Sequence, residues 1–98
     1  MRLVIDKNQQ YSADYKCTSA RDGQRILNER PISMLYIGQS LEGRKTGLDV
    51  LRWAKQKNRL PLYVMITTNV SEHRKILGEF LNTNGFIGDG IFFRKTIH

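Results

Sequence analysis

The stretch that decides the fold runs from Met34 to Ala54 and reads MLYIGQSLEGRKTGLDVLRWA. It begins with a short apolar run, which is typical of a buried strand. The polar segment GQSLEGRKTG follows, and Thr46 then stands where a helix N-cap is expected. After it, Val50, Leu51 and Ala54 recur at helical spacing. The stretch therefore predicts a strand, a loop and a helix in succession, the repeating unit of α/β proteins.

The same alternation continues on both sides of this stretch. The patterns predict strands at residues 2–6, 15–19, 32–38, 60–67 and 91–98, and helices at residues 20–30, 47–58 and 72–84. Thr18 or Ser19 is expected to cap the first helix, and Asn69 or Ser71 the last. We expect a single α/β domain over residues 1–98, with a small, mainly parallel sheet of four to five strands, helices on both faces and a receiver-like or flavodoxin-like arrangement.

The composition is that of a soluble globular chain with an excess of positive charge. Of its 98 residues, 40% are hydrophobic and 26% charged, and the net charge is +7. Such a charge favours nucleic acid, an acidic protein surface or anionic lipid as a partner, although a merely solvated basic surface explains it equally well. Cys17 has no partner for an internal disulfide and belongs to no zinc-binding set, so a place in the core is expected.

No apolar run in the sequence approaches the length of a membrane span, and the N-terminal run is too short for a signal peptide. We therefore expect a cytoplasmic protein that does not act at a membrane. Ligands of open α/β sheets bind beyond the carboxyl ends of the strands. Here those ends are residues 6–7, 38–40 and 67–69, which directs the search for a site to them.

Four segments carry a resemblance to a known family: RLVID, YKCTSARDGQRIL, KTGLDVLRWA and YVMITTN. With them, the chain resembles the receiver, or response-regulator-like, superfamily over most of residues 1–83. Within that superfamily it is most similar to the cyclic-phosphate-processing receiver domains. The most specific piece is the helix start from Thr46 to Leu51, which follows an apolar strand and a loop.

The resemblance implies a site that has lost its chemistry. In phospho-receiving relatives, acids at the ends of two strands hold Mg²⁺, and one of them accepts a phosphoryl group. Asp6 matches one of these acids, whereas Lys7 and Gly38 occupy the positions of two others, and Thr67 matches a serine or threonine position. Cyclic-phosphate-type relatives carry an acidic, histidine-containing stretch after the middle strand, where this chain has Gly38-Gln39-Ser40. We therefore predict no catalytic residue, no metal and no cofactor.

Two groups of residues remain as binding candidates. A pocket for a phosphate ligand is predicted at Asp6, Ser40, Thr67 and Asn69, although helix capping and loop hydrogen bonds would explain the same residues. A basic surface is predicted over the central loop and the last two helices, at Arg44, Lys45, Arg52, Lys55, Lys57, Arg59, Arg74 and Lys75. Phosphate contacts by such a surface would give salt-dependent binding of nucleic acid. The sequence shows no recognition helix and no paired stacking aromatics.

Three functions follow, in order of preference. The first is a non-catalytic, receiver-like protein-binding module that acts as a small regulator or inhibitor, of the kind that phages encode. The second is a nucleic-acid-binding protein that uses a basic helix face. The third is a domain that still binds or processes a cyclic or other phosphate ligand. The sequence identifies neither the partner nor the oligomeric state.

Overall fold

A computed structural model of the chain describes residues 1–8 and 10–96. The elements are β1 (Arg2–Ile5), β2 (Tyr15–Cys17), α1 (Ala20–Glu29), β3 (Met34–Ile37), α2 (Gly47–Gln56), β4 (Tyr63–Ile66), α3 (Ser71–Thr83), β5 (Phe86–Gly88) and β6 (Phe92–Lys95). Ile97 and His98, which were expected in the last strand, lie outside the described residues. None of the helices that the structure describes is long and apolar enough to cross a membrane.

The strands form one six-stranded, mixed sheet in the order β2-β1-β3-β4-β6-β5. Strands β2, β1, β3 and β4 are parallel, while β6 runs antiparallel to both β4 and β5. The α/β class and the mainly parallel sheet are thus confirmed, but the expected four to five strands are too few. The missing strand, β5, is three residues long. Asn84 and Gly85 mark only a helix end in the sequence, and three residues carry too little alternation to indicate a strand.

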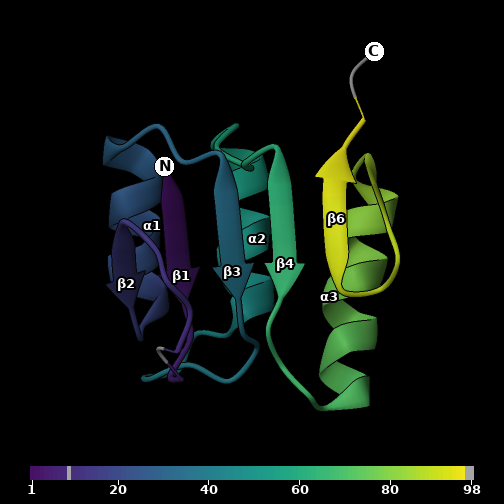
Figure 1. Cartoon of the computed structure of the whole chain (residues 1–98), viewed down its shortest axis with the longest axis horizontal. Coiled ribbons are helices and arrows are strands. Elements are labelled where there is room, and N and C mark those ends of the chain that lie inside the picture. Colours follow the sequence, from purple (N-terminus) through teal and green to yellow (C-terminus); the bar gives the residue numbers. More distant parts are fainter. Residues whose placement is uncertain (9, 97–98) are drawn as a thin grey trace.

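All three helices lie on one face of the sheet, behind it in Figure 1, so the prediction of helices on both faces is wrong. The reason is the direction in which the chain crosses the sheet. The connections β2–α1–β3, β3–α2–β4 and β4–α3–β5 all move the same way, and right-handed crossovers place their helices on one side. The connections from β1 to β2 and from β5 to β6 move the other way, and their described residues, 6–8, 10–14 and 89–91, contain no helix.

A single core fills the space between the sheet and the three helices. Alternate strand residues point into it, and the deepest, each 2% exposed or less, are Leu3, Ile5, Leu35, Ile37, Val64, Ile66 and Phe93. Val50, Leu51 and Ala54, which recur at helical spacing in the sequence, are buried there. Leu77 of α3 is buried as well, whereas its neighbour Ile76 is exposed. Cys17 is a core residue, as predicted: its Sγ donates to the carbonyl oxygen of Val4 over 3.6 Å. Burial raises the pKa of its thiol to about 11, which keeps it protonated and unreactive at neutral pH.

Two of the predicted helix caps are present. Ser19 accepts from the backbone N–H of Asp22, and Thr46 forms a capping box with Asp49. The cap predicted for the third helix is wrong, because its N-cap is Val70 and makes no side-chain hydrogen bond. Capping at Thr46 fixes the angle at which the central loop enters α2, next to the ends of the central strands.

We expect Thr46→Ala to lower the free energy of unfolding by about 1–2 kcal/mol, because it removes the side chain that accepts from Asp49 N–H. Urea denaturation monitored by circular dichroism measures this. Thr46→Ser is the matched control and should stay close to the parent.

The pKa of the Asp49 carboxyl is lowered, first by the hydrogen bond from the Thr46 backbone N–H. A depressed pKa stabilises the fold above the ordinary Asp pKa of about 4, and the contribution is lost as the pH falls through the lower folded value. Asp49→Asn should therefore show a shallower loss of stability below about pH 4 than the parent. Parallel acid-limb profiles for the two chains would contradict this account.

Candidate functional site

The carboxyl ends of the central strands meet at one edge, where Asp6, Gly38 and Thr67 follow β1, β3 and β4. The Thr67 hydroxyl donates to Asp6 Oδ2 over 2.5 Å, and the backbone N–H of Asn8 donates to Asp6 Oδ1 over 3.2 Å. Gly38 lies between the two side chains. A Cβ at this position would stand 2.9 Å from Asp6 Oδ1, so the missing side chain makes room for the Asp6 carboxylate.

The other two residues of the predicted phosphate pocket lie on the loops that follow β3 and β4. Ser40 is exposed on the central loop, and Asn69 is exposed before α3, where its Oδ1 accepts from Arg74 Nη2 over 3.4 Å. The central loop is held by structural contacts. Gln39 Oε1 accepts from the backbone of Leu48, and the N–H of Glu42 donates to the Thr18 carbonyl. The structure thus brings together two of the four predicted residues.

This edge has few groups that could bind a metal ion or accept a proton. Asp6 is its one carboxylate among the residues that directly follow β1, β3 and β4, and both of its oxygens accept hydrogen bonds. Within residues 1–8 and 10–96, no group of three or more His, Cys, Asp or Glu side chains could hold a metal ion. His73 lies in the first turn of α3, after the residues that follow β4. The arrangement therefore supports a hydrogen-bonded strut that ties β1 to β4 across β3.

We expect Thr67→Val to lower the free energy of unfolding by about 1.5–3 kcal/mol, because it removes a hydroxyl donor from a half-buried carboxylate. Thr67→Ser keeps the donor and is the control, with an expected loss well below that of Thr67→Val. Chemical denaturation compares the two variants. A loss in Thr67→Ser with none in Thr67→Val would show that the methyl group of Thr67, rather than its hydroxyl, stabilises this edge.

The predicted basic residues of the central loop and α2 are spread along the helix and beyond both of its ends. Arg44 and Lys45 precede α2 and Lys57 and Arg59 follow it, so the two pairs lie at opposite ends of a helix about 15 Å long. Arg74 is engaged locally, since its Nε donates to the Thr68 carbonyl over 2.8 Å. Between the two pairs, the outer side of α2 carries Arg52 and Lys55, and Lys55 donates to Asn84. Two of these side chains, Arg74 and Lys55, thus donate hydrogen bonds within the protein.

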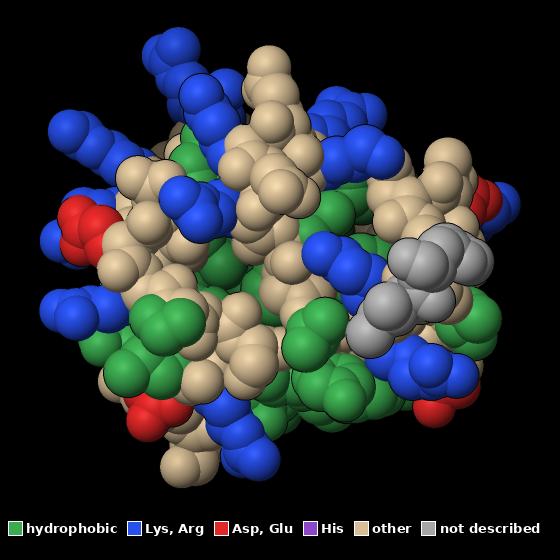
Figure 2. Space-filling view, turned by 90° about the horizontal axis from the view of Figure 1, so that it is seen from above, with side chains coloured by type: hydrophobic (Ala, Val, Ile, Leu, Met, Phe, Trp, Pro, Cys, Tyr) green, Lys and Arg blue, Asp and Glu red, His purple; other side chains and the backbone are tan. Residues whose placement is uncertain are grey.

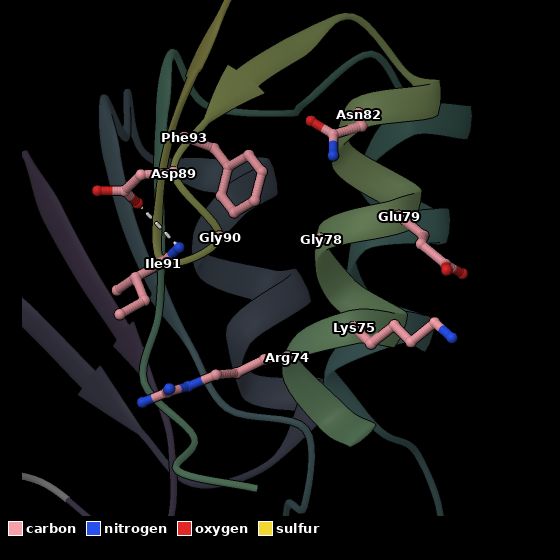
Figure 3. Close-up of a pocket in the computed structure, with 9 residues that line it drawn as sticks. All are labelled: Arg74, Lys75, Gly78, Glu79, Asn82, Asp89, Gly90, Ile91 and Phe93. Carbon is pink, nitrogen blue, oxygen red and sulfur yellow. Dashed lines mark hydrogen bonds between the residues drawn. The ribbon is translucent and has the colours of Figure 1, made fainter. Parts of the chain in front are cut away.

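Figure 3 shows a groove of about 400 Å³ between α3 and the hairpin formed by β5 and β6. Its charged side chains do not converge. Lys75 and Glu79 point away from the hairpin, and Asp89 turns outward and accepts from the backbone N–H of Ile91 over 3.0 Å. A hydrogen bond from the Phe92 N–H, followed by the one from Ile91, lowers the pKa of Asp89, and the carboxylate closes the hairpin turn. These three charged side chains, Lys75, Glu79 and Asp89, therefore do not point toward a common position where a ligand could bind.

The most distinctive surface is the sheet face that no helix covers, which we call the open face. Strand pairing arranges its side chains in two rows. The first row contains Lys16, Val4, Tyr36, Met65 and Phe92. The second contains Arg2, Met34, Tyr63, Arg94 and Ile87.

Aromatic rings gather in the middle of the open face. Tyr63 stacks on Phe92 with ring centroids 5.8 Å apart, and Tyr11, from the connection between β1 and β2, stacks on Tyr36 at 5.2 Å. Between them lies a shallow groove of about 470 Å³ with Met34 among its lining residues. Tyr63 and Phe92 remain 42% and 41% exposed, which is unusual for large side chains at the centre of a face.

Positive charge surrounds these rings. Arg2 and Arg94 occupy the second row and Lys16 ends the first, while Asp14 accepts from the backbone N–H of Arg2 at the margin. Figure 2 looks onto the end of the molecule at which β1–β4 begin. Lys and Arg side chains project around much of its outline, and hydrophobic side chains gather along its lower part, which is the front of Figure 1.

This surface was not predicted from the sequence. Helices were expected on both faces of the sheet, and they would have covered Tyr36 and Tyr63 on the central strands. A signal was present, because Tyr36 and Met34 alternate with Leu35 and Ile37, as on a strand with one exposed face. Comparison of the chain with protein-family models, curated proteins and solved structures finds no match.

Proposed function

We propose that this chain is a non-catalytic, receiver-like binding module that acts as a small regulator or inhibitor through contacts of its open face with a macromolecular partner. One observation carries the proposal. The strand-end edge is occupied by an internal hydrogen bond, whereas the sheet face that no helix covers exposes aromatic side chains. The likeness to receivers is supported by Asp6 and Thr67, which follow two of the central parallel strands, whereas Gly38 follows the third in place of an acid.

The composition of the open face supports a contact role. Tyr, Phe, Met and Arg are the residues enriched at macromolecular interfaces, and the open face has each of them. Exposed rings of this size do little for the stability of an isolated domain, because they stay in contact with water. Their retention is explained if a partner covers them.

The catalytic alternative is tested first. The chain is incubated with cyclic nucleotide phosphates and Mg²⁺ and followed by phosphorus NMR, with Asp6→Asn as the matched variant. We expect an unchanged spectrum for both. Turnover by the parent that is lost in Asp6→Asn would contradict the proposal.

The contact role is tested by capture from a bacterial lysate, with the retained material examined for both protein and nucleic acid. Phe92→Asp places a charge in the open face, and Arg52→Gln, on α2, is the control on the opposite side of the molecule. A stoichiometric partner held by the parent and by Arg52→Gln, but lost by Phe92→Asp, is the expected result. The same material on all three chains, or none, counts against the proposal.

A further inference from the structure

We infer that the partner of the open face is a single-stranded nucleic acid, whose bases stack on Tyr36, Tyr63 and Phe92 while its phosphates meet Arg2, Arg94 and Lys16. The inference rests on the proposed function, since it names the partner of that same surface.

The rings provide the platform. Tyr36, Tyr63 and Phe92 stand on the adjacent strands β3, β4 and β6, so they span about 10 Å of sheet. Tyr63 and Phe92 are the exposed members, and Tyr36 is half-buried beside Tyr11. A sheet face with aromatics at this density stacks two or three unpaired bases. Stacking needs only the π-face that every base has, so such a platform holds single strands with little sequence preference.

The charged side chains beside the rings suit the phosphates of a nucleic acid. The charged residues within the two rows are Arg2, Lys16 and Arg94, all positive, in a chain of net charge +7. Arg2 and Arg94 stand at either side of Met34 and Tyr63 in the second row, so cations flank the rings on both sides. A phosphate backbone that follows the sheet would meet them on either side of the stacked bases.

Other occupants fit these observations less well. A second copy of the chain, packed through the same face, would bring two sets of Arg2, Arg94 and Lys16 together in a desolvated interface, which like charges disfavour. A protein partner would need both an apolar centre and acids placed to meet these cations. A single strand of nucleic acid has flat rings and regularly spaced negative charges in every repeat.

The open face also explains why a duplex would be a poor ligand. The bases of a duplex are stacked on one another, and their π-faces are not available to Tyr63 or Phe92. The basic residues of α2 lie on the other side of the sheet, so charge on Arg52 should not contribute to this contact. These two contrasts separate stacking from general attraction to polyanions.

The experiment is fluorescence anisotropy with labelled oligothymidylate and oligouridylate of about 12 nucleotides, and with a hairpin duplex as competitor. We expect at least one of the two single strands to bind, with an affinity that falls as the salt concentration rises from about 50 to 200 mM. Phe92→Ala and Tyr63→Ala should each weaken binding on the order of ten-fold. Phe92→Tyr, which keeps a ring, should retain it, and Arg94→Gln should reduce the salt slope by about 0.7.

Arg52→Gln is the control for charge, and circular dichroism verifies that each variant is folded. The inference is overturned by no binding at low salt, by equal binding of the duplex, or by binding that Arg52→Gln weakens and Phe92→Ala does not. A concentration-dependent dimer that Phe92→Ala abolishes, without oligonucleotide binding, would also overturn it and identify a second copy as the partner. In that case the proposed contact role stands, whereas turnover of a cyclic phosphate would remove the contact role itself.

Discussion

Phe93→Ala is expected to lower the free energy of unfolding by about 3–5 kcal/mol, whereas Phe92→Ala, one residue away, should cost less than about 1 kcal/mol. Phe93 is 1% exposed and points into the core below β6, where a Cβ on Gly78 would stand 3.4 Å from its ring. Its removal leaves a cavity between β6 and α3. Phe92 is 41% exposed on the open face, so truncation there creates no cavity.

Urea denaturation of the two variants tests whether Phe93 belongs to the core and Phe92 to the open face. The same pair separates stability from contact, because only Phe92→Ala should affect a partner of the open face. Domains of this size have a total stability of about 5–15 kcal/mol, so Phe93→Ala will leave a marginal fold. A loss of several kcal/mol for Phe92→Ala would show that the open face is part of a core.

Gly47→Ala is expected to cost about 3 kcal/mol, the upper part of the range for overpacking. A Cβ at Gly47 would lie 2.0 Å from the carbonyl oxygen of Gly38 and 2.9 Å from its carbonyl carbon. Both are backbone atoms, so neither a rotamer change nor a flexible side chain can relieve the contact. Relief requires a shift of the start of α2, which weakens the hydrogen bond from Gly47 N–H to the Gln39 carbonyl.

Gly78→Ala is the matched control for that substitution. Gly78 lies in the interior of α3, where Ala is favoured over Gly by about 1 kcal/mol. The added Cβ would make an ordinary contact with Phe93 Cζ at 3.4 Å. We therefore expect Gly78→Ala to leave the protein unchanged or slightly more stable. Thermal unfolding compares the two variants, and a smaller loss for Gly47→Ala than for Gly78→Ala would contradict this packing.

Local features of the fold could be predicted from the sequence, because their causes are local. Apolar runs marked β1, β3 and β4, and Thr46 marked the start of α2, since capping depends on residues three apart. The side of the sheet on which the helices lie could not be predicted in the same way. It depends on the direction in which the helical connections from β2 to β5 cross the sheet, which is a long-range choice.

In the candidate site, too, the local features could be predicted and the long-range ones could not. The strand-end edge was located correctly, because the carboxyl ends of parallel strands must meet. The contact between Asp6 and Thr67 joins residues that are 61 positions apart, and its geometry depends on the absence of a side chain at Gly38. The aromatic rows of the open face depend on the register of three strand pairs. A one-residue slip would turn Tyr36 toward the helices.

The position of β6 has a consequence for the order of events during synthesis. It is the last strand in chain order, yet it lies inside the sheet with β4 on one side and β5 on the other. Until β6 emerges from the ribosome, β5 has no neighbour to pair with, and the apolar stripe of α3 lacks the Phe93 ring. The nascent chain can therefore assemble β1–β4 with α1 and α2 early, while the last third waits, unpaired and open to proteases or chaperones, for one short strand.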